Sequence, residues 1–313
     1  MRLAVNFVQV LLLVLAAPAL RGLIAKLKAH IQRRQGASIL RPYADLLKLF
    51  RKEDLIPPNA SPIFQIAPVV GFATAVIAAA FIPVLSASSL LEVRTDFFIF
   101  VYLLALGRFF VSLGALDGGS SFGGLGGSRE ALVSVLAEAP LLLALTSLAV
   151  LSRSLSIAEI ARWTVRQNFF DLSPVHLLAF AALAIVAVAE TGRMPVDNPT
   201  THLELTMLHE AMVLEYSGPS LALIEWAQAI KLHMISALLI ALFLPWGVSS
   251  TLTAGSLALA LLLYCGKIVL LAGAVALVES SVAKLRMYAV PDFLRVASAL
   301  AILAVIFTVF IRK

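Results

Sequence analysis

The polar segment Glu190–Gly218 holds the densest group of side chains in this sequence that could carry acid–base chemistry, and it lies between two long apolar segments. Five of the 18 acidic residues of the chain fall within it, with two histidines and an arginine: Glu190, Asp197, Glu204, Glu210, Glu215, His202, His209 and Arg193. A simple connection between two membrane helices needs none of these charges. The segment therefore predicts proton or charge chemistry, or a docked partner.

A second group of ionisable side chains lies within the apolar segments or at their ends: Arg108, Glu138, Glu225, Lys231, Lys267, Glu190 and Glu279. A charge inside a membrane helix costs about 2.5–3.5 kcal/mol on insertion scales, and it usually faces a cavity or a partner. We expect Lys231 and Lys267 near the bilayer centre. Such a set predicts a hydrated proton path from the membrane rim inward; static ion pairs that fix helix packing are the alternative.

Signals for a metal or nucleotide site are weak. His209-Glu210 begins like the zinc pattern HExxH, but Val213 stands where the second histidine is required. His202 and His209, seven residues apart on one helix face, leave a metal site open as an alternative to an exposed polar face. Cys265 is the one cysteine, so the chain alone holds no iron–sulfur cluster, which needs about four thiolates. The glycine-rich stretch Asp117–Glu130 fits no nucleotide motif and predicts a flexible turn.

The elements that must position these residues are membrane helices. The chain is 61% hydrophobic and 13% charged, with a mean hydropathy of +0.98, which places it in the membrane class. Because a membrane helix needs about 20 apolar residues, we expect an all-α integral membrane protein with one domain, 1–313. About eight transmembrane helices are predicted, near 3–20, 62–85, 97–116, 130–152, 174–190, 219–244, 255–279 and 293–311.

Three shorter segments predict helices on the membrane surface. A Ser156…Glu159 capping box opens an amphipathic helix at 156–170, and a Thr201…Glu204 box opens another within 198–216. The segment 41–54 has helical periodicity at Tyr43, Leu46, Leu47 and Phe50, which suits a docking platform for a soluble subunit.

The distribution of Lys and Arg predicts the orientation in the membrane. Nine of the 24 basic residues lie in 21–61, and the loops 117–129, 191–218 and 280–292 belong to the same side. The positive-inside rule makes that side cytoplasmic. With an even number of helices, both termini are then expected on the non-cytoplasmic side of a plasma or inner membrane.

Four motifs in order give the chain a resemblance to the subunit 1 family of respiratory complex I, which includes subunits of membrane-bound NiFe hydrogenases and of formate hydrogenlyase. They are PYADLLKLFRKE (Pro42–Glu53), AETGRMPVD (Ala189–Asp197), the acidic stretch that ends in LEYSG (Leu214–Gly218), and KLRMY (Lys284–Tyr288). The resemblance covers nearly the whole chain.

Further motifs resemble the hydrogenase and formate hydrogenlyase branch of that family. They are LDGGSSFGGLGGSRE (Leu116–Glu130), AEAP (Ala137–Pro140), and the Lys231 helix followed by LFLPWG (Leu242–Gly247). The first loop departs from the quinone-reducing branch, because RRQGASILRPYAD stands where G-P-x-G-x-x-Q-P-x-A-D is expected.

The resemblance implies a chain without catalytic residues, bound cofactor or metal of its own, which anchors a cytoplasmic redox arm and couples it to ion movement. The proton path or coupling set it implies is Glu138, Glu190, Arg193, Asp197, Glu204, Glu210, Glu215, Glu225, Lys231, Lys267 and Glu279. Partner-docking residues are expected at Arg41, Tyr43, Asp45, Lys48, Lys284 and Arg286.

The implied partners are hydrogenase-type large and small subunits, an Fe–S protein, antiporter-like membrane subunits and the lipid bilayer, with no nucleic acid. NiFe and Fe–S centres are expected in those partner subunits. Two other functions stay open. One is the quinone-site subunit of NADH-quinone oxidoreductase, which predicts a lipid-tail-sized tunnel between the first helix and Glu190–Gly218. The other is a stand-alone secondary transporter, which the lack of an internal repeat disfavours.

Overall fold

The computed structural model describes residues 2–91, 96–166, 173–197, 207–244, 246–249 and 253–311. Within these ranges the protein is all-α, as predicted, and its β structure is limited to an isolated bridge between Ser86 and Ser249. Seven helices are long and apolar enough to cross a membrane. They are α1 (Arg2–Ile31), α3 (Pro62–Ala79), α4 (Phe97–Asp117), α5 (Ser121–Ser152), α9 (Gly218–Phe243), α10 (Ala254–Ser281) and α11 (Val290–Ile311).

A helix forms at each of the eight predicted spans. The predicted span 174–190 is α7 (Pro174–Glu190), an apolar helix shorter than the other seven. At 1.5 Å per residue, its 17 residues extend about 26 Å, slightly less than a hydrocarbon core of about 30 Å. Three boundaries also differ from the prediction. α1 continues to Ile31 instead of ending near residue 20, α3 ends at Ala79 instead of 85, and α5 begins at Ser121.

The early start of α5 makes the prediction of a flexible turn at 117–129 wrong. The Ser120 hydroxyl caps the helix by accepting a hydrogen bond from the Gly123 N–H at 3.0 Å. A Cβ atom on Gly123 would lie 2.3 Å from the carbonyl oxygen of Ala115 in α4. Glycine is therefore needed here for the close approach of two helices, and not for flexibility.

Two of the predicted surface helices form. α2 (Arg41–Phe50) and α6 (Ile157–Arg166) lie within the predicted segments 41–54 and 156–170. In the third segment the structure has only α8 (His209–Val213), and residues 214–217 are not helical, so the prediction for 198–216 fails at its C-terminal end. Residues 198–206, which include the Thr201…Glu204 box, lie outside the described residues.

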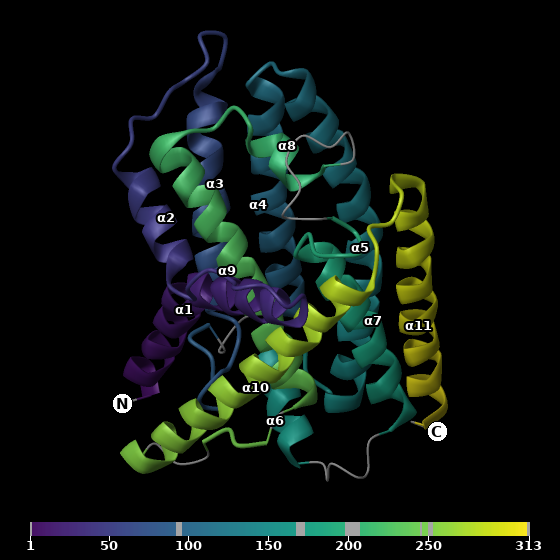
Figure 1. Ribbon diagram of the computed structural model, residues 1–313. Coiled ribbons are helices and arrows are strands. Elements are labelled where there is room, and N and C mark those ends of the chain that lie inside the picture. The colour runs from purple at the N-terminus through teal and green to yellow at the C-terminus, as the bar shows by residue number, and fades with distance from the viewer. Residues whose placement is uncertain are drawn as a thin grey trace.

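α9 forms the centre of the bundle, with the most buried membrane segment of the seven, and it packs against α1, α3, α7 and α10. Figure 1 shows α10 crossing the bundle obliquely, whereas α11 stands at the outer edge beside α5 and α7. A turn of 3-10 helix, Met287–Ala289, leads into α11. Both ends of the chain lie at the lower end of the bundle in Figure 1.

Two prolines inside membrane helices determine where α9 and the residues just before it pack. Pro18 lacks the N–H that would bond to the Val14 carbonyl, and the Trp226 Nε1–H of α9 donates to that oxygen at 3.0 Å. In the same way Pro68 of α3 leaves the Phe64 carbonyl without its helical donor, and the Tyr216 hydroxyl donates to it at 3.2 Å. Each unpaired backbone oxygen is thus satisfied by an aromatic side chain from a distant part of the sequence.

Candidate functional site

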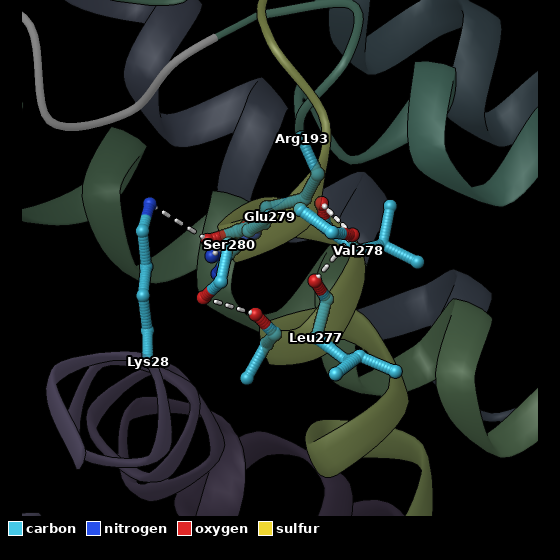
Figure 2. A network of polar contacts seen from close by, with 8 residues as sticks. Lys28, Arg193, Leu277, Val278, Glu279 and Ser280 are labelled. Atoms are coloured by element: carbon cyan, nitrogen blue, oxygen red, sulfur yellow. Dashed lines mark hydrogen bonds and ion pairs between the residues drawn. The ribbon is translucent and has the colours of Figure 1, made fainter. Parts of the chain in front are cut away.

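The end of α10 carries Glu279, which is buried and receives two cations (Figure 2). Lys28 Nζ from the last turn of α1 lies 3.2 Å from Glu279 Oε2. Arg193, just after α7, places its guanidinium 2.9 Å from Glu279 Oε1. One carboxylate therefore joins the ends of α1, α7 and α10.

Arg193 lies between its carboxylate partner and a second cation. Burial lowers the pKa of its guanidinium below the ordinary arginine value, Glu279 opposes that change, and the nearby positive charge of Arg21 adds to it. Because Arg193 is 8% exposed, its charge depends on Glu279 for compensation.

A second group of charges lies deeper, where α4, α5, α7 and α9 meet. Glu190, the last residue of α7, is 4% exposed and forms ion pairs with Arg108 of α4 and Lys231 of α9. The Lys231 Nζ to Glu190 Oε2 distance is 2.9 Å. Arg108 also pairs with Glu138 of α5. The group thus holds two acids and two bases, which balances its formal charge.

A third group lies at the junction of α1, α8 and α9. Arg21 of α1 pairs with Glu225 of α9, and His209 Nε2 lies 3.9 Å from the other Glu225 oxygen. His209 Nε2 is buried and has no hydrogen-bond partner in the described part of the chain. The ring is therefore placed to exchange a proton with Glu225 through a small movement or one water molecule.

Asp197 fixes the position of His209. Its Oδ2 accepts hydrogen bonds from the Leu208 and His209 backbone N–H groups at 3.2 and 3.3 Å, at the start of α8. Its Oδ1 lies 2.9 Å from Lys284 Nζ. Gly192, at φ +57°, begins the turn that brings Asp197 back toward the bundle. The AETGRMPVD segment therefore has a structural role in holding α8.

Three neighbouring cavities in the described part of the chain lie beside these groups. An outer cavity of about 510 Å³ lies between α1, α2, α8 and α9, and a small cavity of about 30 Å³ shares Arg21 and Glu210 with it. An inner cavity of about 70 Å³ shares His209 and Gln228 with the small one and reaches Arg108, Glu130 and Lys231. The three cavities therefore lie in sequence between α2 and the Glu190 group, with charged or polar residues in the walls that they share.

The predicted path residues do not all lie on this route. Glu138, Glu190 and Lys231 form one group and Glu225 another, and Glu210 borders the outer and small cavities. Glu215 is exposed at the surface, and Glu204 lies outside the described residues. Glu279 and Arg193 pair with each other, and Arg193 borders the small cavity.

Lys267 lies apart from the carboxylates. Its Nζ donates to the carbonyls of Leu244, at 2.6 Å, and Trp246, which follow the C-terminal end of α9. The oblique path of α10 brings its middle to the C-terminal end of α9, away from the other predicted path residues. The expected position near the bilayer centre stays a prediction. The Gln228 amide, which lies between Glu225 and Lys231 on α9, donates to the Thr191 carbonyl at 3.3 Å.

The predicted docking residues divide into exposed and internally bonded ones. Arg41 and Asp45 form an exposed ion pair on α2, and Lys48 and Arg286 are exposed. Tyr43 donates to the Leu15 carbonyl of α1 at 2.5 Å, and partial burial raises the pKa of its hydroxyl. Lys284 pairs with Asp197. Tyr43 and Lys284 thus bond to other segments of this chain, whereas the other four predicted docking residues are exposed.

Sequence reasoning does not assign three residues that complete the groups: Arg21, Lys28 and Glu130. Arg108, by contrast, is identified from the sequence as a charge inside a membrane segment. Arg21 and Lys28 fall in a predicted loop because α1 is longer than predicted. No group of three or more potential metal ligands occurs among the described residues, and His202 lies outside them.

Comparisons with known proteins identify the family of this chain. Residues 4–309 match the model of the family described as NADH dehydrogenase. The chain belongs to this family. The match confirms the resemblance to subunit 1 of complex I.

Relatives within the NADH dehydrogenase family place the chain near its hydrogenase branch. It is 33% identical over 288 residues to formate hydrogenlyase subunit 4 of Escherichia coli, with 91% of each chain covered. It is 30% identical to hydrogenase-4 component C of the same organism, covering 96% of this chain and 93% of that one. A subunit of the NADH-quinone oxidoreductase of Thermomicrobium roseum is 33% identical over 69% of each chain.

A solved structure shares the fold of this family member over nearly its full length. It belongs to the membrane-bound sulfane sulfur reductase, described as an archaeal respiratory membrane complex, with a TM-score of 0.81 and 23% identity. The alignment covers 97% of this chain and 99% of that one. The chain is thus a multi-pass membrane protein of the complex I subunit type.

Proposed function

We propose that this chain is the membrane-anchoring, proton- or ion-coupling subunit of a complex I-like NiFe hydrogenase or formate hydrogenlyase. The observation that supports this most directly is the series of cavities joined first by Arg21 and Glu210 and then by His209 and Gln228. The Escherichia coli relatives support the choice of branch.

In this proposal a proton enters the outer cavity and reaches Glu225, whose ion pair with Arg21 weakens when the carboxylate is neutralised. His209 then takes the proton, since its ring lies 3.9 Å from Glu225 and also borders the inner cavity with Lys231. From there the proton reaches the charge-balanced group around Glu190. Each transfer changes the charge next to another ion pair, which links one site to the next.

The chemistry that drives these transfers belongs to partner subunits in this proposal. Large and small hydrogenase-type subunits and an Fe–S protein carry the NiFe and Fe–S centres. They dock on the cytoplasmic face formed by α2 and the acidic segment Glu190–Gly218. Antiporter-like subunits continue the path in the membrane. The exposed ion pair of Arg41 and Asp45, with Lys48 beside it, gives the docking face mixed charge.

The proposal is tested with Glu225→Gln in the complex reconstituted into vesicles. We expect hydrogen or formate turnover to continue while coupled ion movement is lost, because glutamine cannot release a proton. Glu215→Gln is the matched control, since that acid lies in the same acidic segment as His209 but is exposed. Coupled movement at the wild-type rate in an assembled Glu225→Gln complex would contradict the proposal.

A quinone-site subunit is the second candidate, and the outer cavity favours it. The cavity lies between α1 and α8, where a tunnel for a lipid tail is expected, and its volume of about 510 Å³ falls in the range of small-molecule sites, about 300–1,000 Å³. Its lining combines Leu46, Leu49 and Leu221 with Arg21 and Glu225. Turnover of the isolated complex with quinone, compared with hydrogen or formate, separates the two candidates.

A further inference from the structure

An apolar groove of about 350 Å³ lies between α7, α9 and α10, and its walls are mostly aliphatic side chains such as Val188, Leu239 and Leu271. It is accessible from outside the bundle, because Leu270 on its wall is 74% exposed and Phe180 is 43% exposed. The outer cavity of the proposed path has charged side chains, whereas this groove presents mainly hydrocarbon. Its natural occupant is therefore apolar.

The polar groups at the groove wall are already bonded within the protein. The Ser236 hydroxyl donates to the Leu232 carbonyl at 2.8 Å, and the Thr191 hydroxyl donates to the Ala187 carbonyl at 2.6 Å. Arg193 is paired with Glu279 at 2.9 Å. These side chains therefore give an occupant little polar recognition along the length of the groove.

Lys267 is the exception. Its ammonium group has three N–H donors, and the carbonyls of Leu244 and Trp246 take two of them. Both acceptors are neutral, and among the described residues no Asp or Glu forms an ion pair with Lys267. One N–H donor remains beyond those two carbonyls, on a side chain that is 7% exposed at one end of the groove.

The depth of Lys267 in the membrane follows from its contacts with the end of α9. The 26 residues of α9 extend about 39 Å, enough to cross the bilayer. The N-terminal end of α9 contacts Asp54 through Ser220, on the side of the acidic segment. Lys267 therefore lies near the opposite membrane surface. The Trp246 ring, centred 5.2 Å from Lys267 Nζ, agrees with that depth because tryptophan is enriched at membrane interfaces.

The length of the groove matches one lipid leaflet. Along α9 it extends from Leu232 to Leu244, which is about 18 Å at 1.5 Å per residue. Half of a hydrocarbon core of about 30 Å is about 15 Å. The groove thus begins at Lys267 and ends at Thr191, Arg193 and Met194, which follow the C-terminal end of α7.

We propose that this groove binds an anionic phospholipid from the leaflet opposite the acidic segment, with one acyl chain along the groove and the phosphate on Lys267. The lipid fills the space that the oblique α10 leaves against α7 and α9. The groove shares Thr191, Arg193 and Leu232 with the small cavity, whereas Lys267, which holds the phosphate, does not line that cavity.

The test measures lipid retained by the purified, delipidated complex after incubation with phosphatidylglycerol or phosphatidylcholine, by quantitative mass spectrometry. We expect preferential retention of phosphatidylglycerol. Lys267→Gln should weaken it about fivefold, the contribution of one surface cation to binding of an anionic lipid. Ala274→Phe, which fills the groove, should reduce retention of both lipids, whereas Leu277→Phe on the exposed side of α10 should leave it unchanged.

Equal retention of the two lipids by the wild-type complex would overturn the proposal, as would equal losses in Ala274→Phe and Leu277→Phe. An electron-microscopy map of the wild-type complex decides the matter if the variants do not assemble. Elongated density in the groove that ends at Lys267 supports the proposal. A helix of a partner protein seated in the groove refutes it.

Discussion

Lys231 of α9 lies 2.9 Å from the last residue of α7, Glu190. The same carboxylate also pairs with Arg108, so two buried cations depend on one acid. Breaking a buried ion pair by removal of one partner typically costs about 3–5 kcal/mol, because the remaining charge is left buried and uncompensated. Glu190 is therefore the most sensitive member of the group.

Glu190→Gln should lower the stability of the complex by several kcal/mol and abolish coupled ion movement, because Lys231 loses its carboxylate and Arg108 retains only Glu138. Thermal unfolding of the purified complex and ion uptake in vesicles measure the two effects. Asp292→Asn is a suitable control, since this acid forms an exposed i,i+3 pair with Arg295. An unchanged unfolding temperature in Glu190→Gln would show that the group contributes little to stability.

Asp197→Ala should loosen α8. The substitution removes the acceptor for two backbone N–H groups and the partner of Lys284, so residues 207–213 should exchange amide hydrogen faster. Hydrogen-exchange mass spectrometry measures this directly. Asp45→Ala on the exposed surface of α2 should leave exchange in 207–213 unchanged. Equal exchange in Asp197→Ala and wild type would remove the proposed support of His209.

Tyr216→Phe should change the stability of the complex at alkaline pH. Burial, with help from Asp117 and Asp54, raises the pKa of the Tyr216 hydroxyl above its ordinary value of 10.0. Because the pKa is raised in the folded state, the protonated hydroxyl contributes fully to the free energy of unfolding below about pH 10. That contribution is lost as pH rises toward the folded pKa. Between about pH 8 and 11, the free energy of unfolding should therefore fall less steeply with pH in Tyr216→Phe than in the wild type.

The same variant should also be less stable at neutral pH, by about 1 kcal/mol, because the Phe64 carbonyl beside Pro68 loses its donor. Tyr288→Phe is the matched control, since this tyrosine is 93% exposed. If the free energy of unfolding varies with pH in the same way in wild type and Tyr216→Phe, the titration argument is excluded. The hydrogen-bond argument at neutral pH would still stand.

Gly114→Ala should destabilise the packing of α4. A Cβ atom there would lie 2.0 Å from the Tyr216 hydroxyl oxygen and 2.8 Å from the Ala67 side chain, so helices α3 and α4 must separate. Overpacking of this kind costs about 1–3 kcal/mol. Gly273→Ala in α10 is the control, because no atom lies within 4 Å of the position that its methyl group would take. Similar unfolding temperatures for the two variants would contradict the expected clash.

The predictable part of the fold comes from local signals. The periodicity of Tyr43, Leu46 and Phe50 identifies α2, and the Ser156…Glu159 box identifies α6, because both helices separate an apolar face from a polar one. The ends of α1 and α5 are not predictable in this way. Hydropathy alone ends α1 too early, and the glycines of α5, which allow close packing on α4, imitate a loop.

The candidate site is predictable in its residue types but not in its pairs. A charge within an apolar segment is conspicuous, so Glu138, Glu225 and Lys231 are identified from the sequence. Their partners lie far away along the chain, with a separation of 204 residues for Arg21 and Glu225 and of 82 for Arg108 and Glu190. Only the helix arrangement reveals such pairs. The contacts of Lys267 with the residues after α9 are not predictable either, because the sequence does not reveal that α10 is oblique.

The missing N–H groups of Pro18 and Pro68 set the register of the central helix. α9 cannot slide by one turn, about 5.4 Å, without withdrawing Trp226 from the oxygen it satisfies. The same slip would separate Glu225 from Arg21 and Lys231 from Glu190. Through the carbonyls that they leave free, the two prolines thus fix the position of α9, and acids and bases stay opposite one another along the bundle.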